Sequence, residues 1–304
     1  MSVSVSMEQI KDLRTRTQSP ISACQKALQE ANGDLVKAEE ILRTLGQASA
    51  IKKEGRVAAE GRVEVKHSRD HKAAVLIEVN CETDFVARQD NFKAFVQELS
   101  QRALELKATD LKEFLKSSVS SSDSKTIDQA RLDLVAQLGE NVSIRRVAYL
   151  ESQDGSIGAY GHQDSNGMRI GVLLEMATSD FELGRTIAMQ IAAMNPEFLK
   201  IAQIPADRLQ KEKDIFLAQT REQEGSKPEA IQVKIAEGKL KKWQSDAVLT
   251  EQAFVREPNK TIATLLKEHK TDVLRFVRFV VGEGIVKAEN NFAEEVMAQT
   301  KGRV

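Results

Sequence analysis

Two stretches of this 304-residue chain repeat one pattern, and the repeat constrains the fold more than any other feature of the sequence. VLIEVNCETDF ends at Phe85 and VLLEMATSDF ends at Phe181, and both read Val-Leu-x-Glu, a spacer, Thr or Ser, then Asp-Phe. An alternating run that predicts a hairpin precedes each stretch, an apolar helical pattern follows it, and a strand-like run comes later. The sequence therefore predicts two related α+β units with antiparallel sheets.

The elements of the two units can be placed by residue number. The first unit is predicted to span 56–154, and the second to span 155–202 and 248–282. The expected elements are hairpins over 62–79 and 156–176, helices carrying Phe92 to Leu99 and Ile187 to Ile191, and strands over 142–150 and 274–284. GSIGAYG, inside the second hairpin, does not open a helix as a dinucleotide-binding loop does, so its glycines are interpreted as turn residues.

A compact helical module precedes the first unit. The first helix carries Ile10 and Leu13 on one face, and the second has Ser19 as its expected N-cap with Pro20 at the first helical position. A third helix follows Asn-Gly-Asp, and Gly46 is expected to end it. The sequence from 47 to 62 has little apolar periodicity and is interpreted as a linker. We predict a three-helix domain with the start of its linker over 1–55.

The second unit is interrupted by a charged insertion. Two helical patterns flank GSKP, where Gly225 is expected to close the first helix and Pro228 to open the second. The insertion is predicted to be an antiparallel helical hairpin over 203–247. An amphipathic pattern over 284–301 predicts a terminal helix, within a C-terminal helical module over 283–304.

Composition excludes several functional classes. Lys and Arg (44) nearly cancel Asp and Glu (45), so no whole-chain field attracts nucleic acid or anionic lipid. The pairs Arg145-Arg146 and Lys239 to Lys242 are therefore interpreted as solvated faces and not as RNA contacts. No run approaches the length of a membrane helix, and no targeting leader is recognised, so a cytoplasmic protein is expected.

The chain also lacks the motifs of common enzymes. A phosphate-binding loop, a zinc-protease helix and a nucleophile elbow are all missing from the sequence. We therefore expect a binding protein, with no catalytic residue, no metal site and no cofactor. Two alternatives stay open: a cysteine enzyme built on Cys81 and His162, and an adaptor that uses its helical domain to bind other proteins.

The dipeptide Asp84-Phe85 stands between a strand-like run and a helical pattern. One interpretation is structural, because Phe85 precedes Phe92 by seven residues and so fits the buried face of the next helix, with Asp84 as its cap. The echo at Asp180-Phe181 favours that interpretation. The other is that Phe85 points outward to contact another molecule. Spacing alone favours the structural role.

A family resemblance favours the outward role. NCETDFVA, CQKAL with ANGD, LGENVSIRRV, RIGVLLE, PEF, LLKEH and RFVVGEGI occur in the same order over nearly the whole chain. This set resembles the bacterial elongation factor Ts family, the guanine-nucleotide exchange factors of elongation factor Tu. The resemblance implies an α+β fold with a ubiquitin-associated-like three-helix domain, a core of two similar subdomains, an inserted coiled coil and a C-terminal helical module.

The resemblance also implies roles for individual residues. Thr83, Asp84, Phe85 and Val86 would form a wedge that enters the GTPase domain of elongation factor Tu and dislocates its Mg²⁺. The other partner contacts implied are Arg14, Ile21, Ser22, Leu138, Gly139, His162 and Phe292. Ile21 and Ser22 stand where the family usually has two methionines, so a weaker or repacked contact is expected there.

The implied function is that of a translation elongation factor. The chain would bind elongation factor Tu in its GDP-bound and nucleotide-free forms, promote GDP release through the Asp-Phe wedge, and allow GTP to reload. It would not itself catalyse a chemical reaction, and it would contact neither nucleic acid nor membrane directly. The family resemblance also allows a dimer of the complex, formed through the core or the coiled coil.

Overall fold

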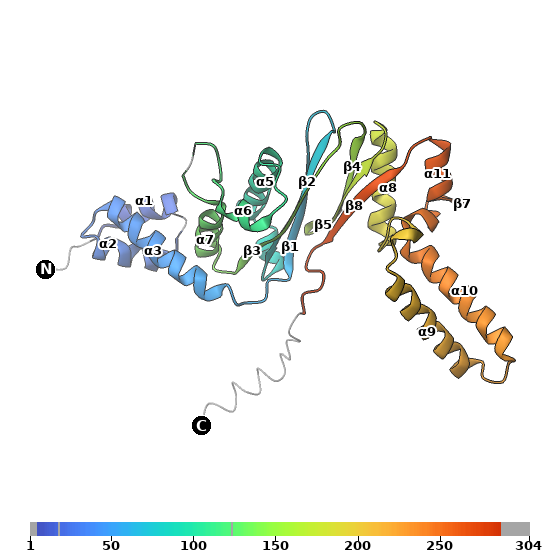
Figure 1. Cartoon of the computed structure of the whole chain (residues 1–304). Helices are drawn as coiled ribbons and strands as arrows, with labels where there is room; N and C mark the ends of the chain where they lie inside the picture. The colour runs from blue at the N-terminus through green and yellow to red at the C-terminus, as the bar shows by residue number, and fades with distance from the viewer. Residues whose placement is uncertain (1–4, 18, 123, 287–304) are drawn as a thin grey trace, which may run out of the picture.

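The computed structural model describes residues 5–17, 19–122 and 124–286. Its helices and antiparallel sheets confirm an α+β fold. Figure 1 shows the three-helix module at one end, two sheets side by side in the middle, and a long helical pair projecting from the other end. The predicted terminal helix lies almost entirely in 287–304, outside the described residues, and so does Phe292.

The N-terminal module packs three helices around a small apolar core. Ser6 caps the first helix, because its hydroxyl accepts the Gln9 N–H while the Gln9 side chain accepts the Ser6 N–H. Asp34 caps the third helix through the N–H groups of Val36 and Lys37. The helices are α1 (Met7–Thr17), α2 (Ile21–Glu30) and α3 (Leu35–Lys53). The predicted cap at Ser19 is wrong: Pro20 occupies the N-cap, with no side-chain cap bond.

The end predicted for the third helix is also wrong, because α3 continues through Gly46 to Lys53. A Cβ built on Gly46 would lie 2.8 Å from the Cβ of Ala136 on α7 (Ile127–Leu138). The glycine therefore permits a close helix–helix approach instead of ending a helix. Ala50, one turn further on, is buried in the core of the first unit. The linker is reduced to 54–59, and α3 joins the module to the first unit.

The first unit is a three-stranded antiparallel sheet in the order β1-β2-β3. Its strands are β1 (Glu60–His67), β2 (Ala73–Cys81) and β3 (Val142–Glu151). The helices that cover it are α4 (Asp84–Ala87), α5 (Asp90–Glu105), α6 (Leu111–Lys116) and α7. The predicted hairpin, helix and third strand of this unit are confirmed.

The second unit repeats this plan in the order β4-β5-β8. Its elements are β4 (Ser156–Asp164), β5 (Gly167–Met176), α8 (Phe181–Met194), the short hairpin β6 (Ala253–Phe254) and β7 (Glu257–Thr261), α11 (Ile262–Glu268) and β8 (Val273–Val280). The interpretation of every GSIGAYG glycine as a turn residue is wrong. Gly158 lies within β4, where a Cβ would meet the backbone of Gly184 on α8 at 2.5 Å.

The two sheets pack against each other, which explains why all nine residues of β2 are buried. One face of β2 places Val75, Ile77 and Val79 against the helices of the first unit. The opposite face places Leu76 in a second buried cluster, which includes Leu173 of β5. The molecule is thus layered as helices, sheet, sheet and helices (Figure 1). A strand covered on both faces loses its polar alternation.

A fully buried carboxylate links the two units. Glu78 of β2 pairs with Arg145 at 3.1 Å and with Arg146 at 2.5 Å, and it accepts the Gly282 N–H at 2.8 Å. The two arginines are therefore not a solvated face, because they neutralise a buried charge. Gly282 has a φ of 72°. This left-handed conformation ends the strand at Val280, before the predicted end at Gly284.

The insertion forms an antiparallel pair of helices, α9 (Ala206–Gln223) and α10 (Glu229–Ala247), which projects beyond the second unit in Figure 1. Between the two helices Thr220, Gln232 and Ala236 are buried. The pair emerges from 3₁₀ turns at Ile201–Gln203 and Leu249–Glu251. At its base the Ala247 carbonyl accepts the N–H groups of Glu197 and Phe198.

Candidate functional site

The most exposed aromatic side chain among the described residues lies on a one-turn helix. Phe85, the second residue of α4, is 74% exposed, whereas the next two residues, Val86 and Ala87, are buried. Thr83 caps the turn, because its hydroxyl accepts the Val86 N–H at 3.4 Å. Val86 and Ala87 anchor the turn in the core of the first unit, so Asp84 and Phe85 are displayed on its outer side.

The structural interpretation of Asp84-Phe85 is wrong for this unit. The cap is Thr83, not Asp84, and Phe85 is not part of the buried helical face. The reason is a break in the helix: α4 ends at Ala87 and α5 starts at Asp90, so the seven-residue spacing to Phe92 does not run along one helix. Phe92 is accordingly buried, whereas Phe85 is exposed.

The echo at Asp180-Phe181 is arranged differently. Asp180 is itself the N-cap of α8 and accepts the Leu183 N–H at 3.0 Å. The Phe181 ring stacks on His71, with centroids 3.9 Å apart, and meets His67 edge-on at 5.7 Å. Both histidines belong to the β1–β2 hairpin. Phe181 thus joins the two units, while its counterpart Phe85 faces solvent.

The electrostatics of the exposed turn leave Asp84 available. Its carboxylate pairs with Arg88 one turn later, and both side chains are partly exposed. Exposed pairs of this kind contribute little, typically about 0–1 kcal/mol. A partner can therefore exchange Arg88 for one of its own groups at low cost.

The loop after α7 supports the turn that carries Asp84 and Phe85. Gly139 ends α7 in the left-handed conformation with a φ of 79°. The next residue, Glu140, accepts the Thr83 N–H at 3.0 Å and the Thr83 hydroxyl at 2.8 Å. Leu138 is half-buried and Gly139 is exposed. Glu140, which directly follows Leu138 and Gly139, thus connects that pair of predicted contact residues to the other predicted set, 83–86.

Sequence reasoning missed Glu140 and also Glu82, which accepts the Asn141 N–H at 2.6 Å. Both glutamates lie inside quoted motifs, LGENVSIRRV and NCETDFVA. A carboxylate next to a glycine that ends a helix is a suitable acceptor for a neighbouring loop. That signal was in the sequence, but the identity of the donor depends on the fold.

The other predicted contacts lie elsewhere. Arg14, Ile21 and Ser22 are exposed on α1 and α2, in the module at the far end of Figure 1. His162 is exposed in β4 of the second unit, and its Nδ1 lies 3.1 Å from the Tyr160 hydroxyl.

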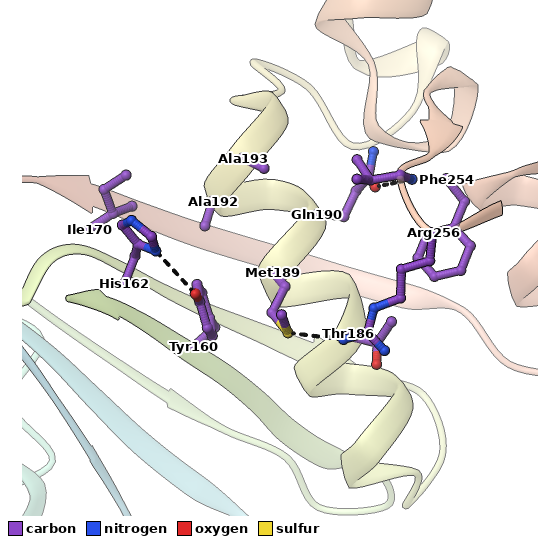
Figure 2. Close-up of a pocket in the computed structure, with 11 residues that line it drawn as sticks. Tyr160, His162, Ile170, Thr186, Met189, Gln190, Ala192, Ala193, Phe254 and Arg256 are labelled. Carbon is purple, nitrogen blue, oxygen red and sulfur yellow. Dashed lines mark hydrogen bonds between the residues drawn. The ribbon is translucent and has the colours of Figure 1, made fainter. Parts of the chain in front are cut away.

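His162 borders a mostly apolar cavity of about 470 Å³ between β4, α8 and the β6–β7 hairpin (Figure 2). At its other side Arg256 extends to within 3.5 Å of the Met189 sulfur. The remaining lining residues are Tyr160, Ile170, Thr186, Gln190, Ala192, Ala193, Phe254 and Val255. The cavity offers an apolar floor between an imidazole and a guanidinium, which suits an apolar side chain of a protein partner.

The structure contradicts the cysteine-enzyme alternative. Cys81 is buried, its thiol donates to the Thr83 carbonyl at 3.1 Å, and it lies in the first sheet while His162 lies in the second. Burial, aided by the nearby carboxylates of Glu140 and Glu60, raises the pKa of the Cys81 thiol to about 12. A thiol with that pKa is not a thiolate near neutral pH. No group of three or more potential metal ligands occurs among the described residues.

Comparison with known proteins places this geometry in a family. The model of a family described as Elongation factor TS matches residues 82–283. Elongation factor Ts of Methylococcus capsulatus is 46% identical over 299 residues, covering 98% of this chain and 99% of that protein. The protein of the same name from Halorhodospira halophila is 46% identical over 300 residues, with 98% and 99% covered. That of Coxiella burnetii is 44% identical over 293 residues, with 96% and 97% covered.

The fold, the displayed aromatic turn and these matches define a translation elongation factor. The chain belongs to the elongation factor Ts family, and its function is nucleotide exchange on elongation factor Tu. The adaptor alternative has no support from the matches. Within the described residues, no helix is long and apolar enough to cross a membrane.

Proposed function

We propose that this chain speeds GDP release from elongation factor Tu by inserting a wedge formed by Thr83 to Val86. The observation that carries the proposal is the 74% exposure of Phe85 on a turn fixed by Thr83 and Glu140. Full burial of a Phe side chain contributes roughly 1.5–3 kcal/mol. Here that free energy is not used in folding and is available for binding a partner.

The proposed wedge acts by non-covalent means, and we propose that the chain is not an enzyme. GTPases hold nucleotide through Mg²⁺ and a backbone cradle around the phosphates. A ring that enters beside this site can hold the partner in a conformation in which the metal is displaced, and Asp84 can draw away a group that supports the metal. Binding of the factor and of GDP then oppose each other, and the coupling is reciprocal. GDP leaves, GTP enters, and the factor is released.

Other surfaces are proposed to hold the complex together. Leu138 and Gly139 stand beside the wedge, Arg14, Ile21 and Ser22 are exposed on the module, and His162 borders the apolar cavity. Phe292 is proposed as a further contact, although it lies outside the described residues. These surfaces supply affinity for both the GDP-bound and the nucleotide-free partner, while the wedge supplies the exchange.

The remaining expectations stand as proposals. The domains are 1–55, a ubiquitin-associated-like module; 56–154; 155–202 with 248–282; the coiled coil 203–247; and 283–304. We propose a cytoplasmic protein, since the buried free cysteines Cys24 and Cys81 fit a reducing compartment. The near-neutral charge fits a role without direct nucleic-acid binding. A dimer of the complex through the core or the coiled coil is also proposed.

A stopped-flow experiment tests the central proposal. Elongation factor Tu loaded with a fluorescent GDP is mixed with excess unlabelled GDP, with and without increasing amounts of this chain. We expect the release rate to rise and to saturate, while the chain alone hydrolyses no GTP. A release rate that does not change at saturating factor would contradict the proposal.

A further inference from the structure

The wedge turn is too short to hold its own shape. The helix α4 has four residues, and an isolated turn of this length gains too few hydrogen bonds to offset the entropy of ordering it. Its cap bond, from the Val86 N–H to the Thr83 hydroxyl, is long at 3.4 Å. Another part of the molecule must therefore fix the direction in which Phe85 points.

Glu140 supplies what the turn lacks. One carboxylate oxygen accepts the Thr83 N–H at 3.0 Å, and the other accepts the Thr83 hydroxyl proton at 2.8 Å. Because the hydroxyl proton is directed to Glu140, the oxygen lone pairs of Thr83 are free to face the Val86 N–H. Hydrogen bonds to an ionised carboxylate are stronger than neutral ones. Glu140 thus fixes both the backbone and the rotamer of the capping residue.

A second carboxylate, that of Glu82, forms a hydrogen bond from the wedge loop back to the loop that carries Glu140. Glu82, one residue before Thr83, accepts the N–H of Asn141, one residue after Glu140, at 2.6 Å. Asn141 in turn donates its side-chain amide to the Arg56 carbonyl at 2.8 Å. The two loops are therefore joined by reciprocal bonds, and neither can turn without breaking one of them.

We propose that Glu140 is a positioning residue for nucleotide exchange, acting through Thr83 to aim Phe85. The inference rests on the proposed function of the wedge. Glu140 follows Gly139 directly, so a partner seated on Leu138 and Gly139 contacts the same loop that holds the wedge. Loss of the carboxylate leaves Phe85 in place in the sequence but removes its fixed direction.

Glu140→Gln is the first test variant. Its amide oxygen can accept the Thr83 N–H, but its NH₂ group then donates to the Thr83 hydroxyl and competes with the Val86 N–H for the lone pairs of that oxygen. We expect the rate of GDP release at saturating factor to fall about 10- to 150-fold, the size expected for a lost charged hydrogen bond. Because the coupling is reciprocal, affinity for nucleotide-free elongation factor Tu should fall more than affinity for the GDP-bound form. Glu151→Gln is the matched control: Glu151 pairs with Lys107 at 2.7 Å in the same unit, far from the wedge in the fold. It should leave exchange unchanged.

Two further comparisons separate positioning from general stability. Thr83→Val removes the hydroxyl bond to Glu140 and the cap bond from Val86 but keeps the backbone N–H bond to Glu140. It should therefore lower the rate of GDP release more than Thr83→Ser, which keeps the hydroxyl. In a Phe85→Ala background Glu140→Gln should add less than about a twofold loss, because the ring it aims is gone. If the two losses multiply, or if Glu140→Gln exchanges like Glu151→Gln, the proposal is wrong.

The geometry can also be tested without the partner. In the free factor the N–H groups of Thr83 and Val86 should exchange with solvent deuterium faster in Glu140→Gln than in the unmodified chain, while those of β2 do not change. Unchanged protection would overturn the proposal. If the unmodified chain failed to speed GDP release from elongation factor Tu, the proposed function would be wrong. The deuterium-exchange measurement would still decide whether Glu140 fixes the turn.

Discussion

Replacing Phe85 and Phe181 by alanine, one at a time, separates partner binding from folding at two positions that the sequence makes equivalent. The structure makes them unlike. Phe85 is 74% exposed, whereas the Phe181 ring lies 3.9 Å from the His71 ring and 5.7 Å from that of His67. Each variant removes the same ring atoms, so the pair provides its own control.

The magnitudes follow from what each ring touches. Truncation of Phe85 removes little buried surface, so the free energy of unfolding should change by no more than about 0.5 kcal/mol. Truncation of a fully buried Phe costs about 3–5 kcal/mol, and Phe181 is half-buried, so about 1–3 kcal/mol is expected. In a chain of this size that corresponds to a fall in Tm of roughly 2–6 °C.

The efficiency of nucleotide exchange should respond in the opposite order, with the larger loss in Phe85→Ala. Phe85→Ala should lose roughly 1.5–3 kcal/mol of interaction with elongation factor Tu, or about 10- to 150-fold in the efficiency of GDP release. Phe181→Ala should exchange nearly normally per folded molecule. The assays are thermal unfolding by circular dichroism and stopped-flow release of fluorescent GDP. Equal losses of Tm for the two variants, with exchange preserved in both, would refute the wedge.

Three further predictions come from other parts of the fold. Gly46→Ala should fail to stabilise the chain, because the new Cβ would lie 2.8 Å from that of Ala136. Gly238→Ala, which is in open space on α10, should instead raise the free energy of unfolding by about 0.5–1 kcal/mol. A stability gain at both positions, measured by calorimetry, would contradict the close α3–α7 contact. Burial lowers the pKa of His67 to about 4, so the unfolded chain takes up the proton first as the pH falls. The free energy of unfolding should therefore fall between about pH 6.5 and pH 4, by on the order of 1–2 kcal/mol after solvent screening. Urea unfolding of His67→Gln should lack this part of the pH dependence. Replacing residues 206–246 by a short Gly-Ser linker should leave the rate of GDP release within about twofold, because Ala247, at the base of the insertion, stays bonded to the second unit. A loss as large as that of Phe85→Ala would show that the insertion takes part in the exchange step.

Local patterns in the sequence predicted much of the fold. Alternating residues identified the two hairpins, helical spacing identified α5 and α8, and the repeated motif showed that the two units share one plan. These predictions succeeded because side-chain periodicity depends on the backbone conformation of neighbouring residues alone. The specific order of the motifs also predicted the elongation factor Ts family, which the comparisons confirmed.

Tertiary packing decided the features that matter for the site. Gly46 has the residue type of a helix end, but α7 lies against it and α3 continues. Asp84-Phe85 and Asp180-Phe181 are the same dipeptide, but the first turn breaks at Ala87 and displays its ring, while the second ring packs on a hairpin of the other unit. A periodic pattern tells which side of an element is apolar, but what covers that side depends on residues distant in the chain. For that reason the exposure of Phe85, and the hydrogen bonds from Thr83 to Glu140 beside it, could be found only in the folded molecule.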